Sequence, residues 1–357
     1  MIYSSTMSAT PLIISLGLLV GVTAALDCTQ IPNNAIIPLS YTTIPAGATG
    51  LVEIPPNFNC VYNVKVPKMV YARVRLENGL KGYNDLITVQ DQQGTYTRVS
   101  SRSPSVLNFY VFPNTTTTFQ VVTKSVDMHS SFRMIVFYQP MYTETVTHLG
   151  NPDMKYFMLN DLQENSYKTP QTIISNEKIS VSMASSGWDA DIFENYFIIK
   201  GDLNNTKSVS RLSRFVGQGY ISTGSSLTVV GLDNRVSESS VTFVPFSQAQ
   251  QYDSYTTFST YFEANQLKID ATVGNKKKKA VTVISMKNIV TVLDVQRTNS
   301  PNCVLKAVQS PPTPSSEIYL DFTTVTDFPR NITHKSFCII AENCGATFNL
   351  VSPFPLR

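Results

Sequence analysis

The feature that most constrains the fold of this chain is its pattern of short apolar or alternating runs, each ended by turn residues. After residue 25 no apolar stripe with helical spacing is sustained over any length. The runs are rich in Thr, Val, Ile, Tyr and Phe, which suit the pleated surface of a sheet. Short strands at regular spacing predict an all-β protein built from sandwiches.

The first third of the chain has this rhythm most clearly. The turns between its runs hold pairs such as Pro55-Pro56 and Asn78-Gly79. Candidate strands cover residues 50–54, 61–66, 70–77, 86–91, 96–99, 106–112, 118–123 and 132–139. These strands fit within the size of one domain, so the segment is predicted to form one β-sandwich.

A similar order of strand-like segments recurs along the chain, and each unit has a usual domain size. The first unit contains YARVRLE, DLITVQD, LNFYVF, FQVVTK and FRMIVFY, the second KISVSMA, NYFIIKG, QGYIST, SLTVVGL and VTFVPFS, and the third QLKIDAT, TVISMKN, EIYLDFT, FCIIAEN and TFNLVSPF. The pattern predicts tandem modules at residues 26–142, 143–250 and 251–357, joined near Pro140–Asp153 and Gln248–Tyr255. The alternatives are that modules two and three are fused, or that one large irregular domain produces loose matches.

Residues 1–25 are predicted to be a cleaved export signal. Thr10–Ala25 reads TPLIISLGLLVGVTAA, an apolar core that closes on small residues. The alternative, a transmembrane anchor, is disfavoured because the run is shorter than the ~20 residues that span a bilayer. The C-terminal TFNLVSPFPLR is broken by prolines and ends in a charge, unlike a lipid-anchor signal. The product is expected to be extracellular, with no membrane anchor.

Sequons and cysteines fit an exported protein. N-glycosylation is predicted in polar loops at Asn114, Asn204 and Asn331. The cysteines are Cys28, Cys60, Cys303, Cys338 and Cys344. Cys28 and Cys60 are the only cysteines in the first half and are expected to form a disulfide. Either Cys338 or Cys344 can pair with Cys303, and the thiol left over is either buried and inert or links two chains.

The segment from Asn59 to Gly94 resembles a CUB domain. It reads NCVYNVKVPKMVYARVRLENGLKGYNDLITVQDQQG, in which a cysteine precedes an alternating strand, a proline follows, the next strand ends in Glu, and a YxDxITVxDxxG motif comes last. Cys28 and the FRMIVFY strand fit the same pattern, so the resemblance covers about residues 27–142. It is nearest to the CUB-like family expanded in nematodes. The resemblance implies that the first module is a jelly-roll-like β-sandwich and an extracellular recognition module that is not an enzyme. With the recurring strand rhythm, the chain is expected to form tandem jelly-roll or CUB-like β-sandwich modules.

The resemblance also implies candidate calcium ligands. CUB domains of the calcium-binding type use a Glu at the end of one strand, an Asp soon after it and a further Asp in a later loop. Glu77, Asp85 and Asp127 occupy roughly these positions. Three carboxylates from neighbouring loops suit a hard cation. The alternative is that all three are solvated loop carboxylates, in which case the chain has no cofactor.

Other chemistry finds little support in the sequence. His129, His148 and His334 lie in no metal-binding or nucleophile motif, so they are interpreted as loop histidines and catalysis is not predicted. The tetralysine run Lys276–Lys279 follows Gly274-Asn275 between two strands and is expected to solvate a hairpin tip. Its alternative role is contact with an anionic surface, such as a glycosaminoglycan or a bacterial envelope. Export and a net charge of only +3 argue against nucleic-acid binding.

Together these features predict a secreted, glycosylated, disulfide-bonded recognition protein. Several nematode members of the CUB-like group are associated with the response to pathogens, so the resemblance implies a role in innate immunity. The partner is then an extracellular protein or glycan, such as one on a microbial surface. The alternative function is a structural glycoprotein of the extracellular matrix or surface coat.

Overall fold

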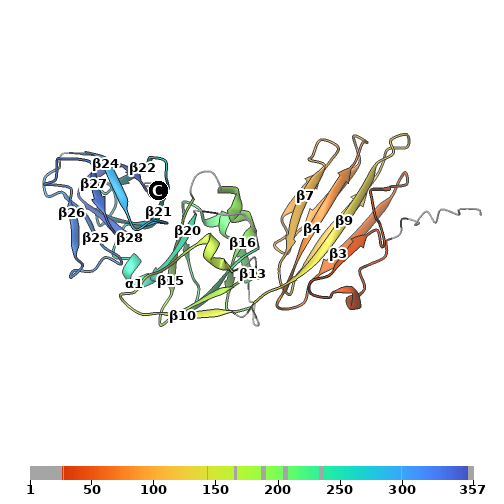
Figure 1. The fold of residues 1–357 in the computed structure, drawn as a ribbon, viewed down its shortest axis with the longest axis horizontal. Coiled ribbons are helices and arrows are strands. Elements are labelled where there is room, and N and C mark those ends of the chain that lie inside the picture. Colours follow the sequence, from red (N-terminus) through yellow and green to blue (C-terminus); the bar gives the residue numbers. More distant parts are fainter. Residues whose placement is uncertain are drawn as a thin grey trace, which may run out of the picture.

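The chain forms three β-sandwich modules that follow one another along the longest axis of the molecule (Figure 1). Each module packs two sheets around a core of its own. The all-β prediction is confirmed. The computed structural model describes residues 26, 28–142, 144–164, 167–185, 190–203, 208–232, 237, 239–298 and 300–352. The predicted export signal at residues 1–25 and the sequon residue Asn204 lie outside the described residues.

The first module contains two antiparallel sheets. One has the order β1-β9-β4-β7 with β2 beside β9, and its strands are β1 (Tyr41–Ile44), β2 (Val52–Glu53), β4 (Val70–Gly79), β7 (Val106–Val111) and β9 (Ser131–Pro140). The other has the order β3-β8-β5-β6, with strands β3 (Asn59–Lys65), β5 (Leu86–Gln90), β6 (Tyr96–Val99) and β8 (Thr116–Val122).

The second module has a sheet of order β10-β14-β19-β16-β17 and another of order β11-β20-β15-β18. The strands of the first sheet are β10 (Thr145–Leu149), β14 (Gln171–Ser175), β16 (Tyr196–Lys200), β17 (Ser208–Arg211) and β19 (Ser226–Gly231). Those of the second are β11 (Lys155–Met158), β15 (Ile179–Ala184), β18 (Tyr220–Ile221) and β20 (Ser240–Pro245). A small hairpin pairs β12 (Gln163–Glu164) with β13 (Tyr167–Lys168).

The third module repeats this plan with sheets β21-β23-β28-β25-β26 and β22-β29-β24-β27. The first sheet contains β21 (Ser254–Thr260), β23 (Lys278–Ser285), β25 (Val304–Gln309), β26 (Ile318–Asp321) and β28 (Ser336–Glu342). The second contains β22 (Asn265–Asp270), β24 (Val290–Arg297), β27 (Arg330–Ile332) and β29 (Gly345–Val351).

Helices in the described chain are short. They are α1 (Phe246–Ala249) and the 3-10 turns η1 (Asn33–Ala35), η2 (Leu159–Leu162), η3 (Ala190–Asn195) and η4 (Leu212–Phe215). Within the described residues, no helix has both the length and the apolar character needed to cross a membrane.

One strand order is repeated in all three modules. Without β10 and β21, which each add a parallel pair at one edge, the sheets of the second and third modules match β1-β9-β4-β7 and β3-β8-β5-β6 strand for strand. Most consecutive strands lie in opposite sheets, as in a jelly roll. The chain passes from the first module to the second between β9 and β10, and from the second to the third between β20 and β21.

The sequence match between the units is correct for the first two and partly wrong for the third. The segments chosen in units one and two lie on equivalent strands, β4, β5, β7, β8 and β9 against β15, β16, β18, β19 and β20. In unit three QLKIDAT, TVISMKN and EIYLDFT lie on β22, β23 and β26, whereas the equivalent strands are β24, β25 and β27. β24 was not recognised in the sequence because a register shift between Val292 and Asp294 breaks its alternation. β27 was missed because it has only three residues.

Alternating side chains build the core of the first module. In β3, Tyr62 and Val64 point inward between exposed neighbours, and in β9 Met134 and Val136 point inward between partly buried ones. Burying a large apolar side chain contributes about 1.5–3 kcal/mol relative to leaving it exposed. The period of two along each strand therefore decides which face of each sheet meets the other.

The joint between the first two modules combines apolar and ionic contacts. Tyr71 and Phe112 of the first module pack with Phe197 of the second in one buried cluster, and the rings of Phe112 and Phe197 lie 5.2 Å apart. Beside them, Arg211 at the end of β17 reaches across to Asp91, with Nη2 and Oδ2 2.5 Å apart. The two modules are therefore held together by an apolar contact and by an ion pair, which restrains how one module is oriented on the other.

At the joint between the second and third modules, the sheet that contains β20 is buried on its outward face as well as on its core face. Every residue of β20 is buried, although a strand that serves one core buries only every other residue. The outward face carries hydroxyls, and Ser182 of β15 is hydrogen-bonded to Thr257 of β21 at 2.5 Å. Ser240 and Ser259 form a similar pair at 2.7 Å. These hydroxyl pairs let two polar faces pack without leaving these groups unsatisfied.

The tetralysine run is not a free hairpin tip, so the prediction that it only solvates a turn is wrong. The ammonium of Lys276 donates to the carbonyl oxygen of Gln250. The ammonium of Lys278 lies 2.6 Å from Glu342 Oε1. The backbone N–H groups of both lysines donate to the carboxylate of Asp253. The run therefore ties the segment between the second and third modules to the third module.

The structure joins Cys28 to Cys60 and Cys303 to Cys344. Of the two partners that the sequence left open for Cys303, it is Cys344 that forms the bond. Cys338 is a buried free thiol on β28, in the cluster that faces the second module. Burial raises the pKa of this thiol well above its ordinary value, so it stays protonated and unreactive at neutral pH.

The Cys303–Cys344 bond can be tested by removing it. The Cys303→Ala/Cys344→Ala variant should lower the free energy of unfolding by about 2–4 kcal/mol, because the open chain regains loop entropy. Denaturant unfolding followed by fluorescence measures this loss. The control is Cys338→Ala, which removes a buried sulfur but no cross-link. Peptide mapping without reductant that finds Cys338 in a disulfide would contradict the assignment.

Candidate functional site

The candidate site is the end of the first module that lies away from the second module, called here the distal end. Three loops meet there. The start of β5 at Leu86 lies opposite the end of β8 at Val122, and the end of β4 at Gly79 lies opposite the start of β9 at Ser131. The three loops are residues 80–85 between β4 and β5, 100–105 between β6 and β7, and 123–130 between β8 and β9. The chain leaves for the second module from the opposite strand ends (Figure 1).

Asp85 fastens two of these loops to each other. It is 1% exposed, and its Oδ1 accepts the backbone N–H groups of Lys124 and Ser125 at 2.8 and 3.0 Å. Its Oδ2 accepts the hydroxyl of Ser130 at 2.6 Å. The same hydroxyl oxygen accepts the N–H of Lys81 at 2.9 Å. One carboxylate and one hydroxyl therefore fix the backbone of both loops, residues 80–85 and residues 123–130.

The local environment keeps this carboxylate charged. Burial alone raises the pKa of Asp85, but the hydrogen bonds from Ser130 and from the two N–H groups together lower it below its ordinary value. Gly82 belongs to the same arrangement, because a Cβ there would lie 1.9 Å from Ser125 Oγ and 2.2 Å from Asp85 Oδ2. A residue with a side chain at position 82 would force the two loops apart.

These fixed loops present apolar side chains to solvent. Tyr83 is 80% exposed, Val126 69% and Met128 55%. The guanidinium of Arg102, on the loop of residues 100–105, lies 5.8 Å from the centroid of the Tyr83 ring and favours one orientation of that ring. Single exposed apolar residues are ordinary on a protein surface, but three at one end on ordered loops are typical of a contact surface.

The distal end also carries more positive than negative charge. Lys81, Lys124 and Arg102 are exposed, and none of the ion pairs between described residues involves them. The exposed acidic residues at this end are Asp127 and Glu53, which is hydrogen-bonded to His129, whereas Asp85 is buried. The surface is therefore apolar at its projecting side chains and cationic around them.

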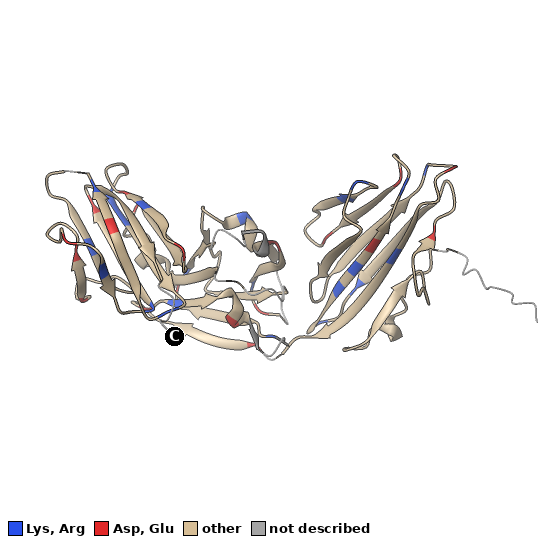
Figure 2. Cartoon of the chain, turned by 45° about the horizontal axis from the view of Figure 1, so that its top comes forward, with Lys and Arg blue, Asp and Glu red and all other residues tan. Residues whose placement is uncertain are grey.

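The three carboxylates predicted as calcium ligands are not brought together. Both oxygens of Glu77 accept hydrogen bonds from Arg133, each at 2.9 Å, and this contact lowers the pKa of Glu77. Figure 2 shows positive and negative segments side by side on the strands of this sheet. Asp85 is committed to the loops, and Asp127 is exposed. Among the described residues no group of three or more His, Cys, Asp or Glu is placed to hold a metal ion.

Two predicted glycosylation sites fall on described residues, and both are exposed. Asn114 lies in the turn between β7 and β8. Asn331 lies on β27, where its Oδ1 accepts a hydrogen bond from the hydroxyl of Thr291 at 2.7 Å. In both places the amide is accessible, and glycosylation there stays a prediction.

The histidines have structural neighbours. His129 is hydrogen-bonded through Nδ1 to Glu53, and His334 stacks on Tyr319 with ring centroids 4.1 Å apart. His148 is exposed on β10. In the described part of the chain, no hydrogen bond joins any of the three to a serine, threonine or cysteine side chain that could serve as a nucleophile.

Sequence reasoning placed Asp85 among metal ligands and did not single out Tyr83, Val126 or Met128. A usable signal was present. These apolar residues lie inside polar, turn-forming segments, KGYND and KSVDMHS, where nothing in a strand pattern requires them. The buried role of Asp85 had no such signal, because it depends on a loop far away in sequence.

Asp85→Asn tests the role of the buried carboxylate. The variant should lose about 1–3 kcal/mol of unfolding free energy at pH 7, since an amide cannot accept all of these hydrogen bonds. The folded-state pKa of Asp85 is lowered, so its contribution is present above the unfolded pKa and is lost as pH falls through the folded pKa. The difference between wild type and variant should therefore shrink below about pH 4.

Denaturant unfolding at pH 7 and at pH 3 measures both effects. Asp127→Asn is the matched control, because it makes the same chemical change on an exposed carboxylate of the same loops. Equal stability of Asp85→Asn and Asp127→Asn at pH 7 would contradict the proposed role.

The first module matches a family model. Residues 23–142 fit the CUB-like domain. No curated protein sequence matches the chain.

The chain also has distant structural likenesses. The CUB1-EGF-CUB2 domains of rat MASP-1 are 9% identical, with 87% of this chain and 97% of that chain covered and a TM-score of 0.24. The human MASP-1/3 CUB1-EGF-CUB2 domain is 11% identical, with 57% and 98% covered and a TM-score of 0.21. The Sulfolobus Turreted Icosahedral Virus structure is 9% identical, with 90% and 99% covered and a TM-score of 0.22.

The assignment therefore rests on the family match and on the two-sheet sandwich found at the same residues. The segment that suggested the resemblance, from Asn59 to Gly94, lies inside the matched range and forms β3, β4 and β5. The first module of this chain is a CUB-like domain.

Proposed function

We propose that this chain is a secreted recognition protein and that the distal end of its CUB-like domain binds anionic microbial surfaces. The observation that carries the proposal is the exposure of Tyr83, Val126 and Met128 on loops that Asp85 holds in place. A CUB-like domain suggests an extracellular binding module, and the distal end offers contact groups for that role.

The rigidity of the loops supports binding at this end. A surface that is already ordered loses little conformational entropy when it meets a partner. The Asp85 and Ser130 hydrogen bonds provide this order before any ligand arrives. Tyr83 adds a large contact area with few rotatable bonds, which suits an anchor residue.

The charge of the distal end supports an anionic partner. Lys81, Lys124 and Arg102 surround the apolar side chains, and they attract anionic groups over about 8–10 Å at ordinary ionic strength. Bacterial envelopes combine phosphate or carboxylate groups with apolar chains, and the distal end has complementary groups for both. Such a target fits a role in innate immune defence.

The rest of the chain supports an extracellular location. Two disulfides suit an oxidising compartment, and Asn114 and Asn331 are accessible to glycosylation. In this proposal the protein binds and does not catalyse, and the histidines serve the structure.

The test measures binding of the full secreted chain to immobilised lipopolysaccharide and lipoteichoic acid by surface plasmon resonance. The Tyr83→Ser/Val126→Ser variant should bind about tenfold more weakly or worse, because it removes the central apolar contacts. Binding should also weaken as salt rises, because the cations are exposed. The matched control is Tyr96→Ser, since Tyr96 is 62% exposed at the opposite end of the same module.

Unchanged binding by the double variant, or no binding to either surface, would contradict the proposal. If the chain instead stays in a salt-resistant matrix fraction and binds matrix polymers, the structural glycoprotein becomes the better assignment. Expression that rises on pathogen challenge would support the defence role independently of affinity.

A further inference from the structure

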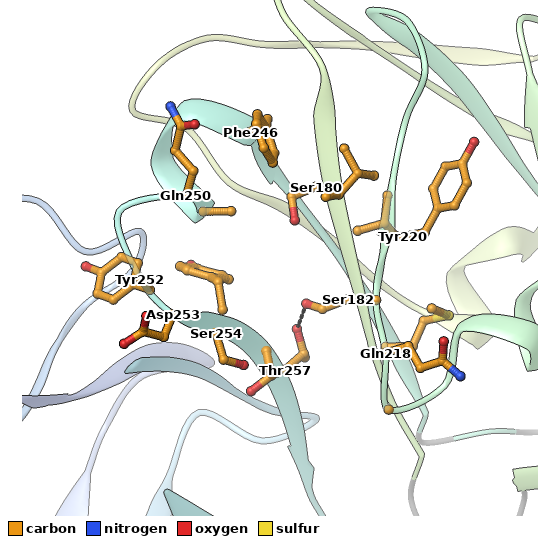
Figure 3. A pocket seen from close by; sticks show the side chains of 18 residues that line it. Ser180, Ser182, Gln218, Tyr220, Phe246, Gln250, Tyr252, Asp253, Ser254 and Thr257 are labelled. Atoms are coloured by element: carbon orange, nitrogen blue, oxygen red, sulfur yellow. Dashed lines mark hydrogen bonds between the residues drawn. The ribbon is translucent and has the colours of Figure 1, made fainter. Parts of the chain in front are cut away.

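A pocket of about 480 Å³ lies where the second and third modules meet. Its walls come from β15, from β18 and the turn before it, from α1, and from the first residues of β21. Figure 3 shows Tyr220 and Gln218 on one side and Gln250 and Ser254 on the other. The pocket is therefore built by both modules, and it is separate from the distal end of the CUB-like domain.

The floor of the pocket is fixed by the joint itself. Ser182 and Thr257, which line it, share the 2.5 Å hydrogen bond that links β15 to β21 (Figure 3). On one wall the backbone is also fixed, because Gly219 has a φ of +73° and a Cβ there would lie 3.1 Å from the carbonyl oxygen of Val181. The pocket is thus part of the folded arrangement and does not depend on long flexible side chains.

The lining combines an aromatic ring with neutral polar groups. Phe246 supplies the ring from the side of α1. The Tyr220 ring does not face the pocket, because Tyr220 lies opposite Val181 in the sheet and packs with Phe215 on the core of the second module, on the face away from Ser182. Ser180 and Ser254 add hydroxyls, which can both donate and accept.

The pocket offers no uncommitted charge. Asp253 is the only charged residue among the lining residues described, and both oxygens of its carboxylate accept the backbone N–H of Lys276, Oδ1 at 3.0 Å and Oδ2 at 3.1 Å. It also accepts the N–H of Lys278 at 3.3 Å, and these backbone hydrogen bonds lower the pKa of Asp253. An anionic ligand would therefore find no counter-charge among these lining residues, and the one carboxylate is already engaged by backbone N–H groups, which favours a neutral ligand.

We infer that this pocket binds a neutral saccharide of one or two hexose units. A pyranose ring has apolar C–H faces that pack on aromatic rings and a rim of hydroxyls that need hydrogen-bond partners. Phe246 matches one face, and Ser180, Ser254 and Gln218 match the rim. A purely apolar ligand would leave those polar groups without partners. The volume lies in the lower part of the range typical of small-ligand sites, about 300–1,000 Å³.

A saccharide in this pocket would also tie the two modules together. A ligand that binds only the folded joint stabilises it in proportion to the logarithm of its concentration. Thermal unfolding of the second and third modules should therefore shift upward with ligand, while that of the CUB-like domain should not.

The test titrates the full chain by isothermal calorimetry with glucose, galactose, mannose, N-acetylglucosamine and their β1,4-linked dimers. At least one sugar should bind, and Phe246→Ala and Gln218→Ala should each weaken it, by about tenfold for the phenylalanine. Tyr96→Ala and Gln266→Ala are the matched controls, because both positions are exposed outside the pocket and should leave binding unchanged. Gln218 is itself exposed, so its variant remains informative even if Phe246→Ala is unstable.

No binding by any of these sugars, or binding unchanged in Gln218→Ala, would overturn the inference. The result is separable from the proposed function, because the Tyr83→Ser/Val126→Ser variant should keep full sugar binding. Loss of sugar binding in that distal variant would likewise overturn the assignment to this pocket.

Discussion

Each module has to close two sheets over one core, and a strand can serve such a core only when every second side chain is apolar. Tyr62 and Val64 in β3 meet this requirement, as do Met134 and Val136 in β9. Because the three modules share one strand order, the same requirement acts three times along the chain. The modules therefore differ at the ends of their strands and in whether an outward sheet face is covered.

The outward faces explain why the modules are not equivalent. In the first module the outer face of β4 and β9 stays near solvent and carries the Glu77–Arg133 pair. In the second, the outer face of β20 and β15 is covered by β21, and Ser182 and Ser240 pair there with hydroxyls. The joint between those modules thus provides both the contact and the walls of a pocket, whereas the first module has a free end for contacts.

Most of the fold follows from local pattern, and most of the candidate site does not. Alternation and turn residues predicted the three sandwiches, because both act within a few residues. The pattern misled where β24 shifts register near Asp294, since a bulge interrupts alternation. The role of Asp85 and the binding of Lys276 to Gln250 depend on loops that meet only after folding, so no local signal specifies them.

The covered face of β20 has a consequence for the order of events during synthesis. Domains fold largely as they leave the ribosome, from the N-terminus onward. The CUB-like domain can finish its core before the later modules exist, but the second module must wait with one sheet face open until β21 has been made. An apolar face waiting in this way would invite aggregation. Ser182, Ser240 and Thr242 keep that face compatible with water until its partner arrives.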